Sequence, residues 1–454
     1  MGRADTVMTS MIWQILAGCL LALVITGFTA SRAAALPAFA VQTGEPCQGC
    51  HVGGFGPQLT PFGREFKLKG YTIRTNAFNL PLSAMAVASY IRSSKSLPPP
   101  VGFSSNDNFA LDQVSLFFAG GFGQHLGAFI QTTYDGVANA FHWDNLDVRA
   151  VTTVRIRGAD AVLGASINNS PTVQDAWNTL PAWGYPYTTS ALAPSPSASP
   201  LLNGALAQTT LGVTGYAWIK SEVYIEAGAY GSPGPTALTR LGVDPLDPGD
   251  INGLAPYGRV ALQKSVAAGT LEIGAFGMET NIFPGLDRTT GFTDHYTDLG
   301  LDGSYIRTFK NGDVLTANGR ILHERQRLSA TCALAGQNVG CASNSITDLR
   351  ADGSYYWHNE IGATVAVFDT FGTGNSTIYS GNRTFKPDSS GVTVQVDGTP
   401  FGGAGSPLGP RFNMRVGVQY TAYAKFDGAG RNYDGLGRNA ADNNTFRVFT
   451  WLAY

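Results

Sequence analysis

Cysteine and histidine occur in one short pattern that could carry chemistry. Cys47, Cys50 and His51 form a C-x-x-C-H motif. Cysteines three residues apart can form thioethers with both vinyl groups of one haem, and the histidine that follows can bind the iron as its proximal ligand. A redox disulfide would need a βαβ context, and a zinc site would need a second ligand pair nearby. The sequence shows neither, so the motif predicts one covalent haem c.

The residues around this motif predict a small module, residues 36–76. Thr60 and Pro61 are typical of a helix start, as N-cap and first helical residue. Phe62 and Phe66 lie four residues apart on one face of that helix, where they could cover a haem edge or form the core of a tiny domain. A module this short cannot form a sufficient hydrophobic core and needs additional stabilisation. The haem, and docking into the following domain, could both supply it.

The N-terminus predicts export from the cytoplasm. The only long apolar run, Met11 to Phe28, follows Arg3 and precedes three alanines that end at Ala35. We interpret residues 1–35 as a secretory signal peptide cut after Ala35, with a cut after Ala40 as the second choice. A membrane anchor is the alternative, although the run is barely long enough to span a bilayer.

Export also bears on the last two cysteines. Cys332 and Cys341 would lie in an oxidising compartment, where unpaired thiols are unusual. We expect a disulfide between them that closes an external loop.

The rest of the chain has the composition of an all-β membrane protein. Charged residues make up 14% of the 454 residues and the net charge is −2, which argues against a nucleic-acid partner. Mean hydropathy is −0.01, too polar for a helical membrane protein and ordinary for a barrel with one face in lipid. The 56 glycines and 11% aromatic residues suit strands, turns and interfacial rings.

Residues 77–454 show repeated period-two alternation, for example over 222–229, 270–275 and 415–420. A soluble sandwich also alternates, but here short connections alternate with long ones and the chain ends on Tyr454. With a separate strand over 391–401, the pattern predicts a 16-stranded transmembrane β-barrel in outer-membrane lipid. One phase of the strands carries charges that we expect inside: Arg149, Arg155, Glu226, Arg259, Glu272, Asp302, Arg320, Asp348, Arg350, Asp352, Arg411 and Arg415.

The stretch LPAFA, the C-x-x-C-H motif and the segment PQLTPFGREFKLKGY (57–71) resemble the fused outer-membrane cytochrome–porins, the family that includes the outer-membrane cytochrome of iron oxidisers. Beyond these residues the likeness is one of architecture. The resemblance implies a monohaem cytochrome c module fused to a porin-like barrel, with Cys47 and Cys50 as attachment sites and His51 as proximal ligand. It also implies electron transfer across the outer membrane of a Gram-negative bacterium. The partners would be an extracellular donor or acceptor, such as Fe(II), and a periplasmic carrier such as a soluble cytochrome c.

Two other functions stay open at this point. The barrel could be a solute porin whose haem module is a plug or a redox sensor. The haem could instead be catalytic, as in a peroxidase, so whether the protein is an enzyme is undecided. Electron transfer favours a shielded, six-coordinate iron, whereas catalysis needs an open distal position.

The distal ligand is therefore the informative residue. Three methionines follow the signal peptide: Met85, Met278 and Met414. Met278 shares the phase of the inward charges, whereas the phases of Met85 and Met414 predict that both face lipid. We expect Met278 to be the distal ligand, with a gap-filling role in the barrel interior as the alternative. His125 and His358, at predicted periplasmic turns, are its rivals.

Overall fold

The computed structural model describes residues 37–75, 80–337, 341–407 and 409–454. The predicted signal peptide, residues 1–35, lies outside the described residues. Within the described ranges, no helix is both long and apolar enough to cross a membrane.

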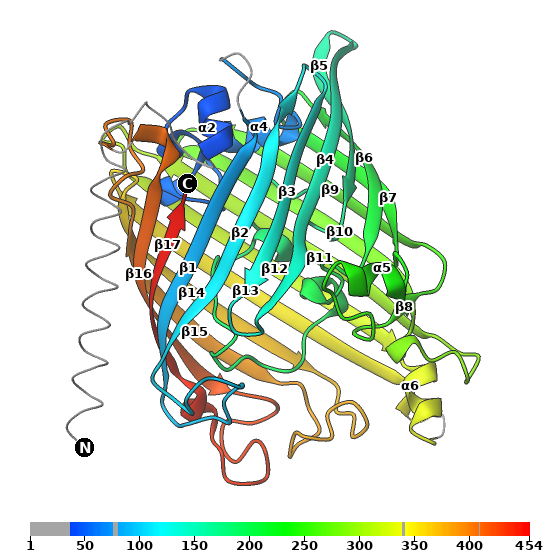
Figure 1. The fold of residues 1–454 in the computed structure, drawn as a ribbon. Helices are drawn as coiled ribbons and strands as arrows, with labels where there is room; N and C mark the ends of the chain where they lie inside the picture. Colours follow the sequence, from blue (N-terminus) through cyan, green and yellow to red (C-terminus); the bar gives the residue numbers. More distant parts are fainter. Residues whose placement is uncertain (1–36, 76–79, 338–340, 408) are drawn as a thin grey trace, which may run out of the picture.

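Sixteen long antiparallel strands form one closed barrel (Figure 1). Strand β1 pairs with β2 on one side and with β17 on the other, which closes the ring. The predicted 16-stranded barrel is confirmed, including the separate strand near 391–401. The strands are β1 (Leu82–Ser93), β2 (Asn108–Phe122), β3 (Leu126–Asp135), β4 (Ala140–Ile156), β5 (Ala159–Asn168), β6 (Leu211–Ile219), β7 (Val223–Gly231), β9 (Ala255–Val266), β10 (Gly269–Phe283), β11 (Asp294–Thr308), β12 (Val314–Arg327), β13 (Ser343–Trp357), β14 (Ile361–Gly372), β15 (Ser389–Gly398), β16 (Asn413–Lys425) and β17 (Thr445–Ala453).

Short helical elements complete the fold. Strand β8 (Asp250–Ile251) is a two-residue addition that pairs with the end of β10. The helices are α2 (Pro37–Thr43), α3 (Cys47–Cys50), α4 (Pro61–Leu68), α5 (Pro235–Arg240) and α6 (Ser329–Leu334).

Side-chain alternation gives the barrel an apolar outer face and a polar lumen. On β10, Glu272 is fully buried in the lumen, whereas the next residue, Ile273, is 60% exposed on the outside. Val365 and Val367 of β14 are likewise exposed outward. A closed barrel satisfies every strand edge internally, and an apolar outer band is what lipid requires. The protein is thus a transmembrane barrel of the bacterial outer membrane.

Most of the predicted inward charges do point into the lumen. The buried ones are Arg149, Glu226, Arg259, Glu272, Asp302, Arg320, Asp348 and Arg415, and Arg350 and Asp352 are half-buried. The prediction is wrong for Arg155, which is exposed beside the β4–β5 turn and pairs with Asp160. It is also wrong for Arg411, which lies in the connection between β15 and β16 and is exposed.

The two ends of the barrel differ in the length of their connections (Figure 1). Short turns at 123–125, 157–158, 220–222 and 267–268 lie at one end, which is the periplasmic end of outer-membrane barrels. Long connections lie at the other, external end. The connection 399–412 is a long exception on the periplasmic side. The disulfide between Cys332 and Cys341 lies in the external connection that carries α6.

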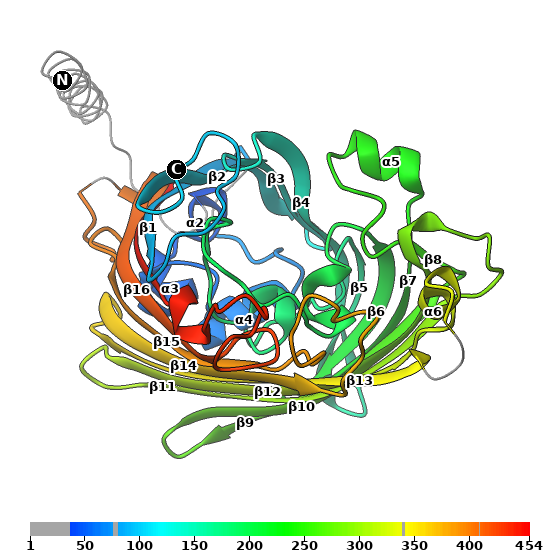
Figure 2. The same cartoon turned by 90° about the horizontal axis from the view of Figure 1, so that it is seen from below.

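Residues 37–75 sit in the periplasmic mouth and reach into the lumen, as Figures 1 and 2 show. Helix α4 begins as predicted: the Thr60 hydroxyl accepts a hydrogen bond from the Gly63 N–H, and Pro61 occupies the first turn. Gly63 packs against α3 so closely that a Cβ there would lie 2.2 Å from the Cys50 carbonyl oxygen. Helices α3 and α4 are therefore held in direct contact.

The long connection between β5 and β6, residues 169–210, also lies inside the ring of strands (Figure 2). Its hydrogen bonds reach walls on different sides of the barrel. Gln174 donates to the Tyr230 hydroxyl on β7, Trp177 donates to Gln263 on β9, and Tyr185 donates to Gln395 on β15. We call residues 169–210 the inserted segment. Together with the 37–75 module, it fills much of the lumen.

Candidate functional site

The two cysteines of the C-x-x-C-H motif lie on one turn of helix, and His51 follows it in an extended conformation. Cys47 and Cys50 are the first and last residues of α3 and both are buried. The ring nitrogen Nδ1 of His51 lies 3.2 Å from the Gln58 carbonyl oxygen. A carbonyl can only accept, so Nδ1 carries the proton and the lone pair is on Nε2. A histidine that ligates a metal through one nitrogen is ordinarily oriented by such a bond from the other.

Two barrel asparagines fix the motif in place. Asn413 on β16 donates to the Cys47 sulfur at 3.0 Å and to the Gly54 carbonyl at 2.8 Å. Asn359, in the turn after β13, donates to the His51 carbonyl at 3.0 Å and accepts from the Gly53 N–H at 2.6 Å. Sequence reasoning missed both asparagines, because a lone Asn near a strand end carries no motif.

Burial keeps the motif's side chains neutral. Burial in the mouth of the barrel raises the pKa of the Cys50 thiol to about 12, and Glu45 and Cys47 add to the rise. Burial lowers the pKa of the His51 imidazole to about 4, although the hydrogen bond that His51 donates to the Gln58 carbonyl acts in the opposite direction. A neutral imidazole is the form that binds a metal.

A cavity of about 350 Å³ borders the motif, a size within the range of ligand pockets. Cys50 and His51 line it near the periplasmic end. Seven phenylalanine and tryptophan residues contribute to the wall: Phe39, Phe55, Phe66, Phe117, Phe129, Trp183 and Trp451. The cavity continues along β2–β4 toward the external half of the barrel, where its lining becomes polar with Gln113, Gln131, Asp144 and Asn145.

The cavity's residues fit a haem c. Flat aromatic and apolar walls suit a macrocycle, a thiol of the attachment pair opens onto the cavity, and His51 presents its Nε2 lone pair. Tyr187 also lines this cavity, and its hydroxyl is buried with no hydrogen-bond partner among the described residues. Leaving a buried hydroxyl unsatisfied is costly, so this group calls for a polar ligand atom.

The structure places the candidate distal ligands differently from the sequence expectation. Met278 faces inward, as predicted, but packs in a cluster with Leu180, Leu202 and Leu322 and does not border the cavity. Met85 was predicted to face lipid, and this is wrong, because it faces inward and lines the cavity. The prediction failed because the apolar residues on one face of β1 were taken to face lipid. Val87 on that face points inward and packs against Phe55 and other rings of the lumen.

The other candidates lie where the sequence placed them. Met414 is on the outward phase of β16, next to the inward Arg415. His125 and His358 lie in periplasmic turns, and neither lines the cavity.

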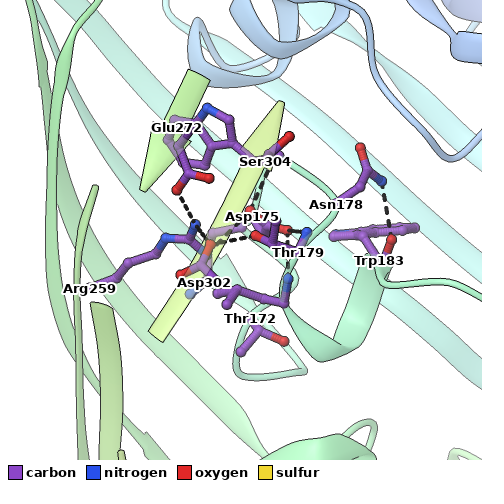
Figure 3. A network of polar contacts seen from close by, with 12 residues as sticks. Thr172, Asp175, Asn178, Thr179, Trp183, Arg259, Glu272, Asp302 and Ser304 are labelled. Atoms are coloured by element: carbon purple, nitrogen blue, oxygen red, sulfur yellow. Dashed lines mark hydrogen bonds and ion pairs between the residues drawn. The ribbon is translucent and has the colours of Figure 1, made fainter. Parts of the chain in front are cut away.

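On the far side of the lumen, a network of buried charges holds the inserted segment (Figure 3). Arg259 on β9 pairs with Asp175 of the inserted segment at 3.2 Å, with Glu272 on β10 at 3.1 Å and with Asp302 on β11 at 2.8 Å. Thr179 of the inserted segment also donates to Asp302, at 2.5 Å. Three strands and the inserted segment therefore meet at one guanidinium.

The module is tied to the inserted segment as well. The Lys67 ammonium on α4 donates to the carbonyls of Val173 and Asp175 at 2.8 and 2.7 Å, and lies 4.4 Å from the centre of the Trp183 ring. Burial lowers the pKa of Lys67 to about 7, and the nearby Arg149 adds to this. The Leu59 N–H donates to the Asn178 side chain at 2.9 Å. Module, inserted segment and barrel thus form one packed unit.

No protein-family model matches the chain, and no curated protein matches its sequence. Solved structures of bacterial outer-membrane proteins are similar to it in outline. OmpT of Vibrio cholerae is 9% identical over 82% of this chain and 96% of its own, with a TM-score of 0.41. An anion-selective porin from Comamonas acidovorans is 10% identical over 82% and 98%, with a TM-score of 0.43. The outer-membrane channel DcaP of Acinetobacter baumannii is 10% identical over 82% and 96%, with a TM-score of 0.46. We draw neither activity nor selectivity from likenesses this remote.

Proposed function

We propose that this protein transfers electrons across the outer membrane through one covalent haem c held in the mouth of its barrel. The donor would be extracellular, with Fe(II) as one possibility, and the acceptor a periplasmic carrier such as a soluble cytochrome c. This is the role that the resemblance to the fused cytochrome–porins implies. Electron flow in the opposite direction, from a periplasmic donor to an extracellular acceptor, would use the same haem and the same residues.

One observation carries the proposal. The C-x-x-C-H motif borders a cavity with aromatic residues in its wall, inside the barrel, and the bond from His51 Nδ1 to the Gln58 carbonyl leaves the Nε2 lone pair available for an iron. Cys47 and Cys50 would hold the haem by thioethers and His51 would bind its iron. The bound haem would supply a one-electron couple.

The surrounding residues suit that role. The aromatic residues of the wall would exclude water from a bound macrocycle, and Asn413 and Asn359 fix the C-x-x-C-H loop to the barrel. The polar arm of the cavity, with Asp144 and Gln131, extends toward the external half of the wall, where an outside donor would approach. The module itself lies at the periplasmic end, where a soluble carrier would dock (Figure 1).

A solute channel is the second candidate, because a 16-stranded barrel is wide enough to leave an aqueous passage. The inserted segment and the module oppose it, since they cross the lumen and bury Trp177, Leu202 and Leu206 almost completely. Haem catalysis is the third candidate function, and it would require an iron with an open distal position.

The test uses full-length protein in liposomes that contain trapped, oxidised soluble cytochrome c. An impermeant reductant outside should reduce the trapped cytochrome with the wild type and not with Cys50→Ala, whose barrel should still show heat-modifiable migration. Planar-bilayer conductance of the wild type should lie far below that of an open porin. A protein without covalent haem, or a haem protein that conducts like an open porin and leaves the trapped cytochrome oxidised, would overturn the proposal.

A further inference from the structure

The part of the barrel wall that contacts the attachment loop also brings one sulfur to the haem cavity. Asn413 on β16, Ala453 on β17 and Met85 on β1 are register partners across three neighbouring strands. Strands lie about 4.8 Å apart, so Met85 is about 10 Å along this row from Asn413. Asn413 is the residue that donates to the Cys47 sulfur. Met85 therefore stands in the same layer of the barrel as the haem attachment site, on the inward face.

The position of the Met85 sulfur is fixed by a neighbour. The indole N–H of Trp451 donates to it at 3.2 Å, and both side chains line the cavity. Met85 also packs against the cluster that contains Phe55, four residues after His51. A thioether sulfur has two lone pairs, so this hydrogen bond leaves one for a metal.

Other side chains on the cavity are poorer candidates for an iron ligand. Of the described residues that line it, His51 is the only histidine and Met85 the only methionine. The Lys67 ammonium is bound to two carbonyls, and the Tyr71 hydroxyl donates to Asp147 at 2.6 Å. Met278, which the sequence pattern favours, is packed among leucines away from the cavity.

We infer that Met85 is the distal ligand of the haem iron, and that Trp451 positions its sulfur. This inference rests on the proposed function, because it presupposes the haem on Cys47 and Cys50. A His/Met pair shields the iron and raises its reduction potential relative to a bis-histidine pair. Both properties suit an electron-transfer haem that accepts electrons from a weak reductant.

The experiment compares Met→Leu variants of all three methionines in the full-length haem protein. Leucine conserves volume and apolar character while removing the sulfur. The oxidised wild type should show the long-wavelength sulfur–iron absorption band, and Met85→Leu should lose it. Met278→Leu, in the lumen but off the cavity, and Met414→Leu, on the lipid face, should keep it. In the reduced state Met85→Leu should bind CO at least about tenfold faster than the wild type, and its potential should fall.

The results that would contradict this inference differ from those that would contradict the proposed function. Loss of the band in Met278→Leu with retention in Met85→Leu would overturn the inference in favour of Met278. A wild type that carries covalent haem but lacks the band, for instance with Tyr187 as ligand or an open site, would overturn the inference while leaving the proposed function standing. A wild type without covalent haem would overturn both. If Met85→Leu fails to retain haem, Trp451→Phe provides the test, because it keeps an aromatic ring and removes the N–H that positions the sulfur. The band should then shift, and an unmoved band would overturn the inference.

Discussion

The two sides of the barrel lumen are built differently. The side formed by β9–β11 is filled with buried charges in mutual contact, centred on Arg259 and joined to Asp175 of the inserted segment. The side formed by β1–β4 and β17 contains the cavity, which is lined by aromatic, apolar and amide side chains, and its buried charges form separate ion pairs such as Arg447 with Asp112. Sixteen strands enclose more space than their own side chains can fill. Anchoring the inserted segment firmly on one side leaves the other side free for a cofactor.

The two sides of the lumen should also differ in their tolerance to mutation. A buried charge network is destabilised strongly when one partner is removed, because the remaining charges stay desolvated. An aromatic cavity wall loses only local packing. The charged side should therefore control stability and the cavity side should control the properties of the haem.

The largest expected effect is on the cavity side. Cys50→Ala removes one thioether, so haem stain on denaturing gels should be lost or greatly weakened while the barrel still assembles. The paired control is Cys332→Ser with Cys341→Ser, which opens the external disulfide and should leave the stain unchanged. Haem that acid acetone extracts from the wild type would show that no covalent bond exists.

Arg259→Met tests the charged side. It leaves Asp175, Glu272 and Asp302 without their shared cation and should lower the free energy of unfolding by about 3–5 kcal/mol. Unfolding in detergent measures this, and planar-bilayer conductance should rise as the inserted segment loosens. Arg155→Met, which breaks only the exposed pair with Asp160, should change neither quantity. Equal effects of the two variants would mean that the buried network does not anchor the segment.

Lys67→Met tests the link between module and inserted segment. It leaves the carbonyls of Val173 and Asp175 without their donor, at a cost of about 1–3 kcal/mol. Because the folded pKa of about 7 lies below that of an unfolded lysine, the unfolded chain binds more protons above pH 7. Stability should then rise with pH from about 7 to 10 in the wild type.

This rise should be smaller in Lys67→Met. Lys69→Met, one residue past the end of the same helix, removes a half-exposed pair with Glu65 and should keep the wild-type pH profile. A Lys67→Met protein with an unchanged profile would assign the pH dependence to other groups. Unfolding midpoints across this pH range provide the measurement.

The smallest effect is expected at the polar end of the cavity. Asp144 accepts hydrogen bonds from Thr133, Asn145 and Gln208 and has no cation partner among the described residues. Asp144→Asn removes a negative charge that attracts a small cationic reductant. The rate at which that reductant reduces the haem should fall at most about fivefold, which corresponds to about 1 kcal/mol of attraction. High salt should remove the difference, because it screens the charge. Asp160→Asn, at the periplasmic turn, is the control. If stopped-flow at low salt gives equal haem reduction rates for Asp144→Asn and the wild type, the donor does not enter through the polar end of the cavity.

The sequence by itself determined the strand pattern, and it contains the complete C-x-x-C-H motif on which the haem proposal rests. Alternation marks a lipid face and a lumen face because side chains of a strand point to opposite sides. The motif can be recognised locally because two thioethers and an iron ligand would all come from five consecutive residues. The start of α4 at Thr60 and Pro61 is local for the same reason.

Only the tertiary structure decided what the lumen side chains meet. Val87 and Ile91 are apolar, and their alternation predicts lipid, yet they face inward because rings and loops fill the barrel there. The same error placed Met85 on the lipid face, whereas it lines the cavity. Asn359 and Asn413 reach the C-x-x-C-H motif from more than 300 residues away, and the inserted segment meets Arg259 across the lumen. These contacts depend on barrel closure and strand register, which no local pattern specifies.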